Sequence, residues 1–268
     1  MSMTPEAIKQ AADALFEAEM RRKQIGILTK VNPTMDMEDA YAIQAALVQR
    51  KLAAGRSAKG WKIGLTSKAM QAALQIDIPD SGVLFDDMFF DNGATIPAGR
   101  FIQPRIEAEI AFVMKAPLHG PDVSREDVLA ATDYVAPALE ILDTRIVRSD
   151  PETGALRKVF DTIADNAANA GIVLGDERHA IAAVDLRWVG VIVQRANEVE
   201  ETGLGAGVLN DPATGIVWLA NRLAQYNAAI SAGDVVLSGS FIRPIEAPSG
   251  ADFCADFGSF GQVRCTFG

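Results

Sequence analysis

Residues 105–113 of the chain read RIEAEIAFV, and this stretch decides the fold. Its β-branched and aromatic residues favour a β-strand, and Pro104 marks the start. Successive side chains of a strand point to opposite faces. The even-numbered positions from 106 to 112 carry only apolar side chains and predict a face that covers a core. Glu107, Glu109 and Ala111 share the other face.

The paired glutamates leave two interpretations open. Glu107 and Glu109 lie about 6–7 Å apart on an extended chain. Each raises the pKa of the other and opposes burial unless a positive charge lies between them. They are therefore either harmless residues on a solvated face or ligands of a cation. Glu140 interrupts the apolar run of residues 134–142 and also needs a partner. That partner is an arginine, a hydrogen-bond network, or a cation shared with the other two glutamates.

Composition narrows the class of protein. The chain has 268 residues, of which 49% are hydrophobic, enough for a sizeable core in one large domain or two small ones. A formal net charge of −10 argues against a nucleic-acid partner. An anionic substrate then needs a local arginine, lysine or metal. There is no run of eighteen apolar residues and no apolar signal segment, so we expect neither a membrane span nor a signal peptide.

Cysteine and histidine are scarce, with two residues of each. Cys254 and Cys265 lack metal-ligand spacing and indicate reduced core residues of a cytoplasmic protein. His119 and His179 lie in turn-like stretches, where we expect them at the surface. Histidine-based triads and histidine-rich zinc sites are poorly supported. A metal in this chain is expected to have oxygen ligands.

Helix signals crowd the first third of the chain. Thr4 and Asp36 are N-caps for two helices, and Ser67 is expected to cap a third over residues 68–75. Shorter helices are predicted at 125–131, after Ser124, and at 213–223. Strands are predicted at 60–66, 172–174, 186–193, 235–241 and near the C-terminus. This order predicts an α+β fold, with a helical N-terminal part (1–80) docked on a mainly β part (81–268) as one integrated unit.

Several polar positions have both a structural and a functional interpretation. Lys62 is either a lysine at a sheet edge or an ammonium held in a site. Asp80 would ordinarily form a turn within residues 78–82. Residues 238–241 are either a plain strand end or a carboxylate-binding turn. The glycine-rich residues 203–207 indicate a flexible turn, because no lysine follows them. Residues 160–171, rich in small and amide side chains, suggest close packing or a subunit contact.

Motifs along nearly the whole chain resemble the hydratase and decarboxylase branch of the fumarylacetoacetate hydrolase superfamily. They are GWKIGLTSKAM (60–70), DDMFF (86–90), RIEAE (105–109), ALE (138–140), DPET (150–153), KVFDTI (158–163), DNAANAG (165–171) and GSF (239–241). The glutamate pattern is shared by the whole superfamily. The segment 150–171 is more specific for a hydratase.

The resemblance implies a rolled mixed β-sheet flanked by helices, in a homo-oligomer. It also implies that Glu107, Glu109 and Glu140 bind Mg²⁺ or Mn²⁺, which agrees with the preference of hard cations for oxygen ligands. Lys62 and Asp80 match the family's proton-handling residues. Substrate contacts are implied for Leu65, Thr66 and Ser240. The distal carboxylate of the substrate needs a cation, for which we expect Arg105 or Arg145.

The activity implied is metal-dependent hydration of a small dicarboxylate, 2-hydroxyhepta-2,4-dienedioate, in the breakdown of aromatic compounds. The alternatives are decarboxylation of 2-oxohex-3-enedioate, hydration of 2-hydroxypenta-2,4-dienoate, and a non-catalytic scaffold subunit of a hydratase–decarboxylase complex. Hydrolases of the superfamily activate water with a Glu–His pair, and the scarcity of histidine disfavours that branch. A sequence of this kind does not show the metal used or the preferred chain length.

Overall fold

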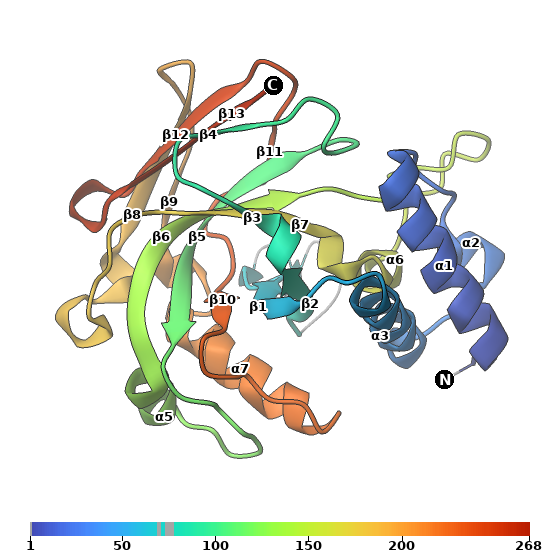
Figure 1. Ribbon diagram of the computed structural model, residues 1–268, viewed down its shortest axis with the longest axis horizontal. Coiled ribbons are helices and arrows are strands. Elements are labelled where there is room, and N and C mark those ends of the chain that lie inside the picture. Colours follow the sequence, from blue (N-terminus) through green and yellow to red (C-terminus); the bar gives the residue numbers. More distant parts are fainter. Residues whose placement is uncertain (1, 69–70, 73–77) are drawn as a thin grey trace.

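The computed structural model describes residues 2–68, 71–72 and 78–268, and it has an α+β fold (Figure 1). A rolled eight-stranded sheet forms the centre, a five-stranded sheet packs beside it, and the N-terminal helices lie together on the other side. The predicted fold class is confirmed. The helix predicted over residues 68–75 lies mostly outside the described residues.

Two N-terminal helices, α1 (Pro5–Arg21) and α3 (Met37–Ala53), begin after the predicted capping residues. The four-residue α2 (Leu28–Val31) between them was not predicted, and no side chain caps its start. The Thr4 side chain accepts a hydrogen bond from the Ala7 N–H, and the Asp36 side chain accepts one from Asp39. Apolar residues of α1 and α3 pack with α6 (Val159–Ala164) in a separate small core. This core anchors α6 and the loop before it, which border the site described below.

The large sheet mixes parallel and antiparallel pairs. Its strands are, in order, β2 (Asp80–Phe85), β1 (Ala58–Gly64), β10 (Val235–Leu237), β5 (Arg105–Met114), β6 (Thr132–Leu142), β7 (Asn169–Leu174) and β3 (Phe89–Phe90). The short β11 (Ile245–Glu246) pairs with β5. β1 with β10 and β3 with β7 are parallel pairs, and the others are antiparallel.

The sheet rolls so that β2 approaches the start of β7. The Asn166 carboxamide accepts a hydrogen bond from the Val83 N–H at 2.8 Å and donates one to the Val83 carbonyl at 2.9 Å. Asn169 donates to the same carbonyl at 3.1 Å. Residues 160–171 thus pack closely, as predicted. The two faces of β5 also behave as predicted, because its even-numbered positions from 106 to 112 are fully buried in the main core.

The second sheet packs against that apolar face. It contains β4 (Ala94–Ile96), β13 (Gln262–Phe267), β12 (Asp252–Asp256), β8 (Gly190–Arg195) and β9 (Glu198–Leu204). Helices α5 (Arg125–Ala131) and α7 (Pro212–Ala224) flank the sheets. Single 3₁₀ turns are Asp86–Met88, Asn166–Ala168, Ile181–Ala183, Leu186–Trp188, Gly205–Gly207 and Gly258–Phe260.

Three local predictions are wrong. Residues 186–188 form a 3₁₀ turn ahead of β8, because the Asp185 side chain accepts a hydrogen bond from the Arg187 N–H and closes the turn. Residues 203 and 204 end β9 and are not a flexible turn. Asp80 is not in a turn but begins β2, opposite Gly64. β1 and β2 therefore belong to the large sheet. The division of the chain at residue 80 stays a prediction.

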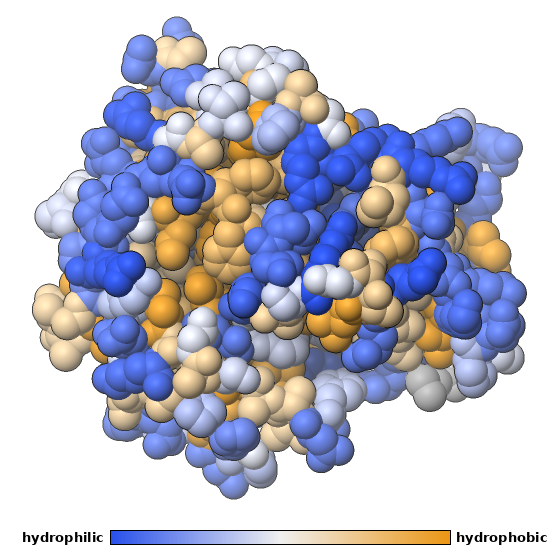
Figure 2. Space-filling model, in the orientation of Figure 1, coloured by the Kyte–Doolittle hydropathy of each residue, from blue (hydrophilic) through white to orange (hydrophobic). Residues whose placement is uncertain are grey.

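The surface is mixed in character. On the face shown in Figure 2, hydrophobic residues gather left of centre over β6, and hydrophilic residues gather on the right over α1 and the loops beside it. Both cysteines are buried and unpaired. Within the described part of the chain, no helix has the length and apolar character needed to cross a membrane.

Candidate active site

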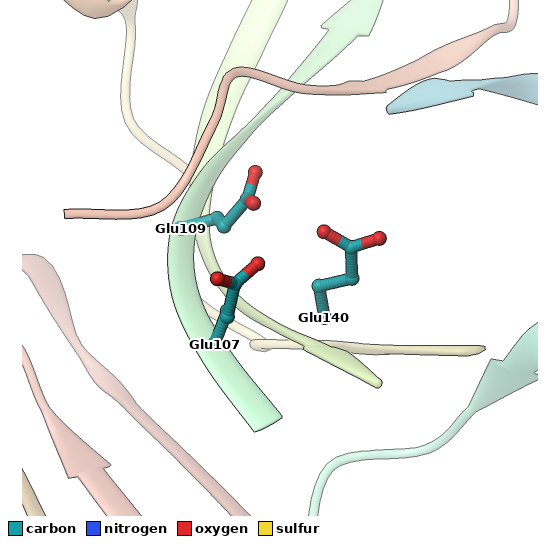
Figure 3. A group of neighbouring side chains, drawn as sticks. All are labelled: Glu107, Glu109 and Glu140. Carbon is teal, nitrogen blue, oxygen red and sulfur yellow. The ribbon is translucent and has the colours of Figure 1, made fainter. Parts of the chain in front are cut away.

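Three glutamates converge at the middle of the rolled sheet (Figure 3). The antiparallel register of β5 and β6 places Glu107 directly opposite Glu140, and Glu109 follows two residues along β5 on the same face. Their nearest ligand oxygens all lie within 4.8 Å of one another. Glu109 and Glu140 are completely buried, whereas Glu107 is partly exposed. The solvated-face interpretation of these glutamates is therefore wrong.

The polar contacts of these glutamates are incomplete. The Gly239 N–H donates to Glu109 Oε2 at 2.8 Å, and Lys62 Nζ lies 3.3 Å from Glu140 Oε1. Among the described residues, Glu109 Oε1 and both oxygens of Glu140 have no hydrogen-bond partner. Buried carboxylate oxygens left in this way are costly unless something outside the chain satisfies them. Three carboxylates with free oxygens suit a hard divalent cation.

Burial raises the pKa values of all three glutamates, and repulsion between carboxylates adds to it for Glu107 and Glu109. Burial, followed by the charge of Glu140, raises the pKa of Glu107 to about 8. The same two causes, with Glu107 added, raise the pKa of Glu109 well above its usual range. Burial also raises the pKa of Glu140, against the opposing charge of Lys62. Without a cation these groups resist ionisation together, so a cation is needed to hold all three as carboxylates.

Lys62 and Asp80 stand beside the glutamates, on neighbouring strands β1 and β2, and both are buried. Burial disfavours the ammonium form of Lys62, but the nearby carboxylates outweigh burial and raise its pKa. Burial raises the pKa of Asp80, opposed by Lys62. A side chain at Gly64 would place its Cβ 2.2 Å from Asp80 Oδ1 and 3.1 Å from Lys62 Nζ. Gly64 therefore makes the space in which the two groups meet.

A cleft of about 590 Å³ opens onto these groups. Four of the five residues predicted to contact substrate line it; these are Leu65, Thr66, Ser240 and Arg105. Lys62, Asp80 and Glu107 also reach its wall, whereas Glu109 and Glu140 lie behind. Thr66 packs against Gly239, where a Cβ would come within 2.2 Å of the Thr66 hydroxyl oxygen. This contact and a φ of +113° require glycine at 239.

Two sequence-based expectations need correction. Arg145 cannot meet a substrate carboxylate, because it is 1% exposed and its Nε donates to Asp165 Oδ1 at 2.5 Å. His179 is only half-exposed, since its ring stacks on Phe260 with the centroids 4.5 Å apart. His119 is exposed, as predicted. Neither histidine lies among the residues of the cleft.

Some residues of the site escaped the sequence analysis. Gly239 lies in the turn that was offered as a carboxylate-binding one, but the carboxylate that accepts its N–H is that of Glu109, which the sequence did not indicate. Arg148 and Arg157 line the cleft together with Arg105. Their signal was available, because both lie inside or beside the specific segment 150–171, but an exposed arginine in a loop is ordinary when its neighbours in space are unknown.

Comparison with known proteins defines first the class and then the branch. No family model matches the chain. Its fold matches 4-oxalocrotonate decarboxylase from Pseudomonas putida G7, solved with magnesium and adipate, at a TM-score of 0.93 and 34% identity, over 99% of both chains. At 52% identity the chain resembles 2-oxo-hept-4-ene-1,7-dioate hydratase of Escherichia coli, over 96% of both sequences. It is 39% identical to 2-keto-4-pentenoate hydratase of Paraburkholderia xenovorans, over 99% of this chain and 96% of that one.

These likenesses cover almost the whole chain. A putative fumarylacetoacetate hydrolase family protein from Yersinia pestis CO92, 13% identical to this chain, shares its fold at a TM-score of 0.56. The fold and the buried glutamates define a metal-binding enzyme of the fumarylacetoacetate hydrolase superfamily. The chain belongs to the hydratase and decarboxylase branch of this superfamily. The predicted family is confirmed.

Proposed function

We propose that this chain hydrates 2-oxohept-4-ene-1,7-dioate, or its 2-hydroxy-2,4-diene tautomer, to 4-hydroxy-2-oxoheptanedioate. The observation that carries the proposal is a single cleft whose wall joins the glutamate cluster to Lys62, Asp80 and several arginines. The 52% identical relative is named for this reaction. A small anionic dicarboxylate also suits a basic cleft in a chain whose net charge is −10.

Glu107, Glu109 and Glu140 are the residues that would hold Mg²⁺ or Mn²⁺. When bound there, the cation supplies a Lewis acid that favours the enolate form of a 2-oxo acid. The solved decarboxylase relative carries magnesium. In this chain Gly239 keeps Glu109 in place through its N–H, and Thr66 fixes Gly239 by contact.

Lys62 and Asp80 would move the protons of the reaction. From the 2-oxo-4-ene tautomer, hydration delivers one proton to C5 and removes one from the water whose oxygen bonds to C4, so the two transfers balance. From the 2-hydroxy-2,4-diene tautomer, the proton lost from the 2-hydroxyl is matched by a second one delivered to C3. Lys62 is held as an ammonium by the carboxylates around it and can donate. Asp80 lies on the neighbouring strand, near enough for its charge and that of Lys62 to act on each other, and would take part in the other transfer.

The remaining contacts follow the shape of the cleft. Leu65 and Thr66 continue directly from β1, and Ser240 continues from β10, so both loops border the same space. Arg105 lies on β5 two residues before Glu107. We also propose that the active form is a homo-oligomer in the cytoplasm.

A product assay tests the proposal. Protein stripped of metal is offered the seven-carbon dienedioate with and without Mg²⁺, and the products are resolved by mass. We expect a gain of one water only when Mg²⁺ is present. Absence of metal-dependent turnover of this compound and of its five- and six-carbon relatives would contradict the proposal.

Decarboxylation is the second candidate, favoured by the TM-score of 0.93 to 4-oxalocrotonate decarboxylase. The same assay distinguishes the two, because decarboxylation of 2-oxohex-3-enedioate releases CO₂ and adds no water. A scaffold role would require a preparation that neither binds metal nor turns over substrate but still binds a partner enzyme.

A further inference from the structure

Three arginines meet at one end of the cleft. Arg105 comes from β5, and Arg148 and Arg157 face each other across a short hairpin, where the Arg157 N–H donates to the Arg148 carbonyl at 3.1 Å. An antiparallel bridge between Ser149 and Leu156 continues this hairpin. All three arginines line the cleft of the glutamates, and all three also line a neighbouring cleft of about 430 Å³. They stand between the two spaces.

These three arginines lack the acidic partners that two other arginines, Arg145 and Arg243, have. Arg145 pairs with Asp165 and Arg243 pairs with Glu201. In the described residues, Arg105, Arg148 and Arg157 make no ion pair within 4.0 Å. The Arg157 side chain donates a long hydrogen bond of 3.4 Å, from Nη1, to the Ile146 carbonyl.

The three side chains also repel one another. Burial lowers the pKa of Arg157; Asp165 opposes this, and the charges of Arg105 and Arg148 add to the lowering. The acidic groups that act on Arg105 are Glu107, Glu246 and Asp143, none within ion-pair distance. Three positive groups held together, none of them in an ion pair within 4.0 Å among the described residues, make a site for an anion.

We propose that Arg148 and Arg157, with Arg105, bind the second carboxylate of the substrate and so select dicarboxylates over monocarboxylates. This inference rests on the proposed function and names the residues that determine its specificity. Arginine binds a carboxylate through two parallel N–H donors, and two or three such side chains can enclose its oxygens.

The spacing along β5 fits such a substrate. Arg105 and Glu107 lie on the same face of β5, and two positions two residues apart on a strand have Cα atoms about 6–7 Å apart. Six C–C bonds in an extended chain span about 7–8 Å. The length of a seven-carbon dicarboxylate thus matches the spacing of these two positions along β5, whereas a five-carbon monocarboxylate has no second charge to place at the arginines. The hairpin is held in position by Lys30, whose Nζ lies 2.7 Å from Asp150 Oδ2 near its tip.

Calorimetric titration of the Mg²⁺-loaded protein with heptanedioate and heptanoate tests the inference. These two probes have the same length and differ by one carboxylate. We expect the wild type to prefer heptanedioate by about tenfold or more, since 1.4 kcal/mol of charge-assisted bonding corresponds to a factor of ten. Arg148→Gln and Arg157→Gln should each reduce this ratio several-fold and leave heptanoate binding unchanged. Arg148 is exposed, so its replacement leaves the fold intact.

Arg243→Gln is the matched control, because Arg243 lines the same cleft but is neutralised by Glu201. Its ratio should equal that of the wild type. Arg157→Lys keeps the charge and should keep part of the preference. The inference is overturned if the wild type binds heptanedioate no more tightly than heptanoate. It is also overturned if the Arg148 and Arg157 variants lose affinity for both probes equally, or if Arg243→Gln reduces the preference for heptanedioate as much as they do.

Turnover measured on the same preparations separates the two proposals. If hydration is normal and the preference does not depend on Arg148 or Arg157, the inference fails and the function stands. If the preference depends on both arginines and no substrate is hydrated, the function fails and the dicarboxylate site stands.

Discussion

Two groups of buried acids in this chain differ in what surrounds them. Asp165 accepts hydrogen bonds from Arg145 Nε at 2.5 Å and from the Arg145 N–H at 2.8 Å. Glu140, buried to the same degree, has only the ammonium of Lys62 at 3.3 Å beside one oxygen. A buried acid that stabilises the fold, such as Asp165, receives its hydrogen bonds from other residues of the chain. An acid left with free oxygens points to a partner that the chain does not supply.

The largest expected effect comes from removing one of the unsatisfied acids. Glu140→Gln keeps the size and removes the charge, so Mg²⁺ binding should be lost and turnover should fall at least about 10⁴-fold, since Lewis-acid catalysis is worth several kcal/mol. Metal-free stability should fall by less than the 3–5 kcal/mol expected for a buried charge left unpaired, because Asp80, Glu107 and Glu109 still act on the buried Lys62 ammonium. Calorimetry with Mg²⁺ and urea unfolding measure both. If this variant bound Mg²⁺ as tightly as the wild type, the free oxygens of Glu140 would not be metal ligands.

Replacing Lys62 tests whether this lysine transfers a proton in the reaction or only stabilises the buried glutamates. Lys62→Ala should lower turnover about 10²–10⁴-fold, the usual contribution of a proton-transferring side chain, and Asp80→Ala should fall in the same range. Mg²⁺ affinity should be kept or increased, because a competing positive charge is gone. Lys59→Ala, on the same strand but exposed, is the control. Equal losses in Lys59→Ala and Lys62→Ala would show a general effect of charge.

Asp165→Ala removes the buried acid whose hydrogen bonds come from the chain itself. It leaves the buried guanidinium of Arg145 without its acid, and we expect a loss of about 3–5 kcal/mol in the free energy of unfolding. Mg²⁺ affinity of the folded protein should be unchanged. Urea unfolding and calorimetry on one preparation measure both quantities. If the variant were as stable as the wild type, the hydrogen bonds that Asp165 accepts would not mark it as an acid that stabilises the fold.

The smallest effect concerns Asp150 and sharpens the contrast in pKa. Hydrogen bonds from Lys30 and then Thr153 lower the pKa of Asp150 to about 2, from a usual 3.8. A lowered pKa in the folded state stabilises the protein above pH 3.8 and loses this contribution as the pH falls towards about 2. Asp150→Asn should therefore melt slightly below the wild type at pH 6, and the difference should shrink on acidification. A difference independent of pH would exclude the ionised form as its cause.

The sequence predicted what depends on neighbours along the chain. The alternation in residues 105–113 identified the strand and its two faces, and capping residues located the helices. The site residues came from the family resemblance, and their catalytic roles stay predictions. What the sequence missed depends on contacts between distant segments. The register that sets Glu107 opposite Glu140 is one example.

Arg145 and Arg157 show the same limit. Twelve positions apart, both arginines follow a strand and precede a helix, and nothing local tells them apart. Arg145 is fully buried against Asp165, and Arg157 turns towards the cleft. Asp80 was misplaced for a related reason, because the turn preference of a proline–aspartate pair was overridden by pairing of β2 with β1.

The carboxamide of Asn166 has a consequence beyond closing the roll. β2 is the last strand at its end of the sheet, and its residues 80–85 are all buried. By matching the N–H and C=O of Val83, Asn166 imitates the peptide group of one more strand. An apolar edge strand is otherwise open to pairing with another molecule during synthesis or stress. This asparagine therefore protects the protein from aggregation, and replacing it should reduce soluble yield before it reduces activity.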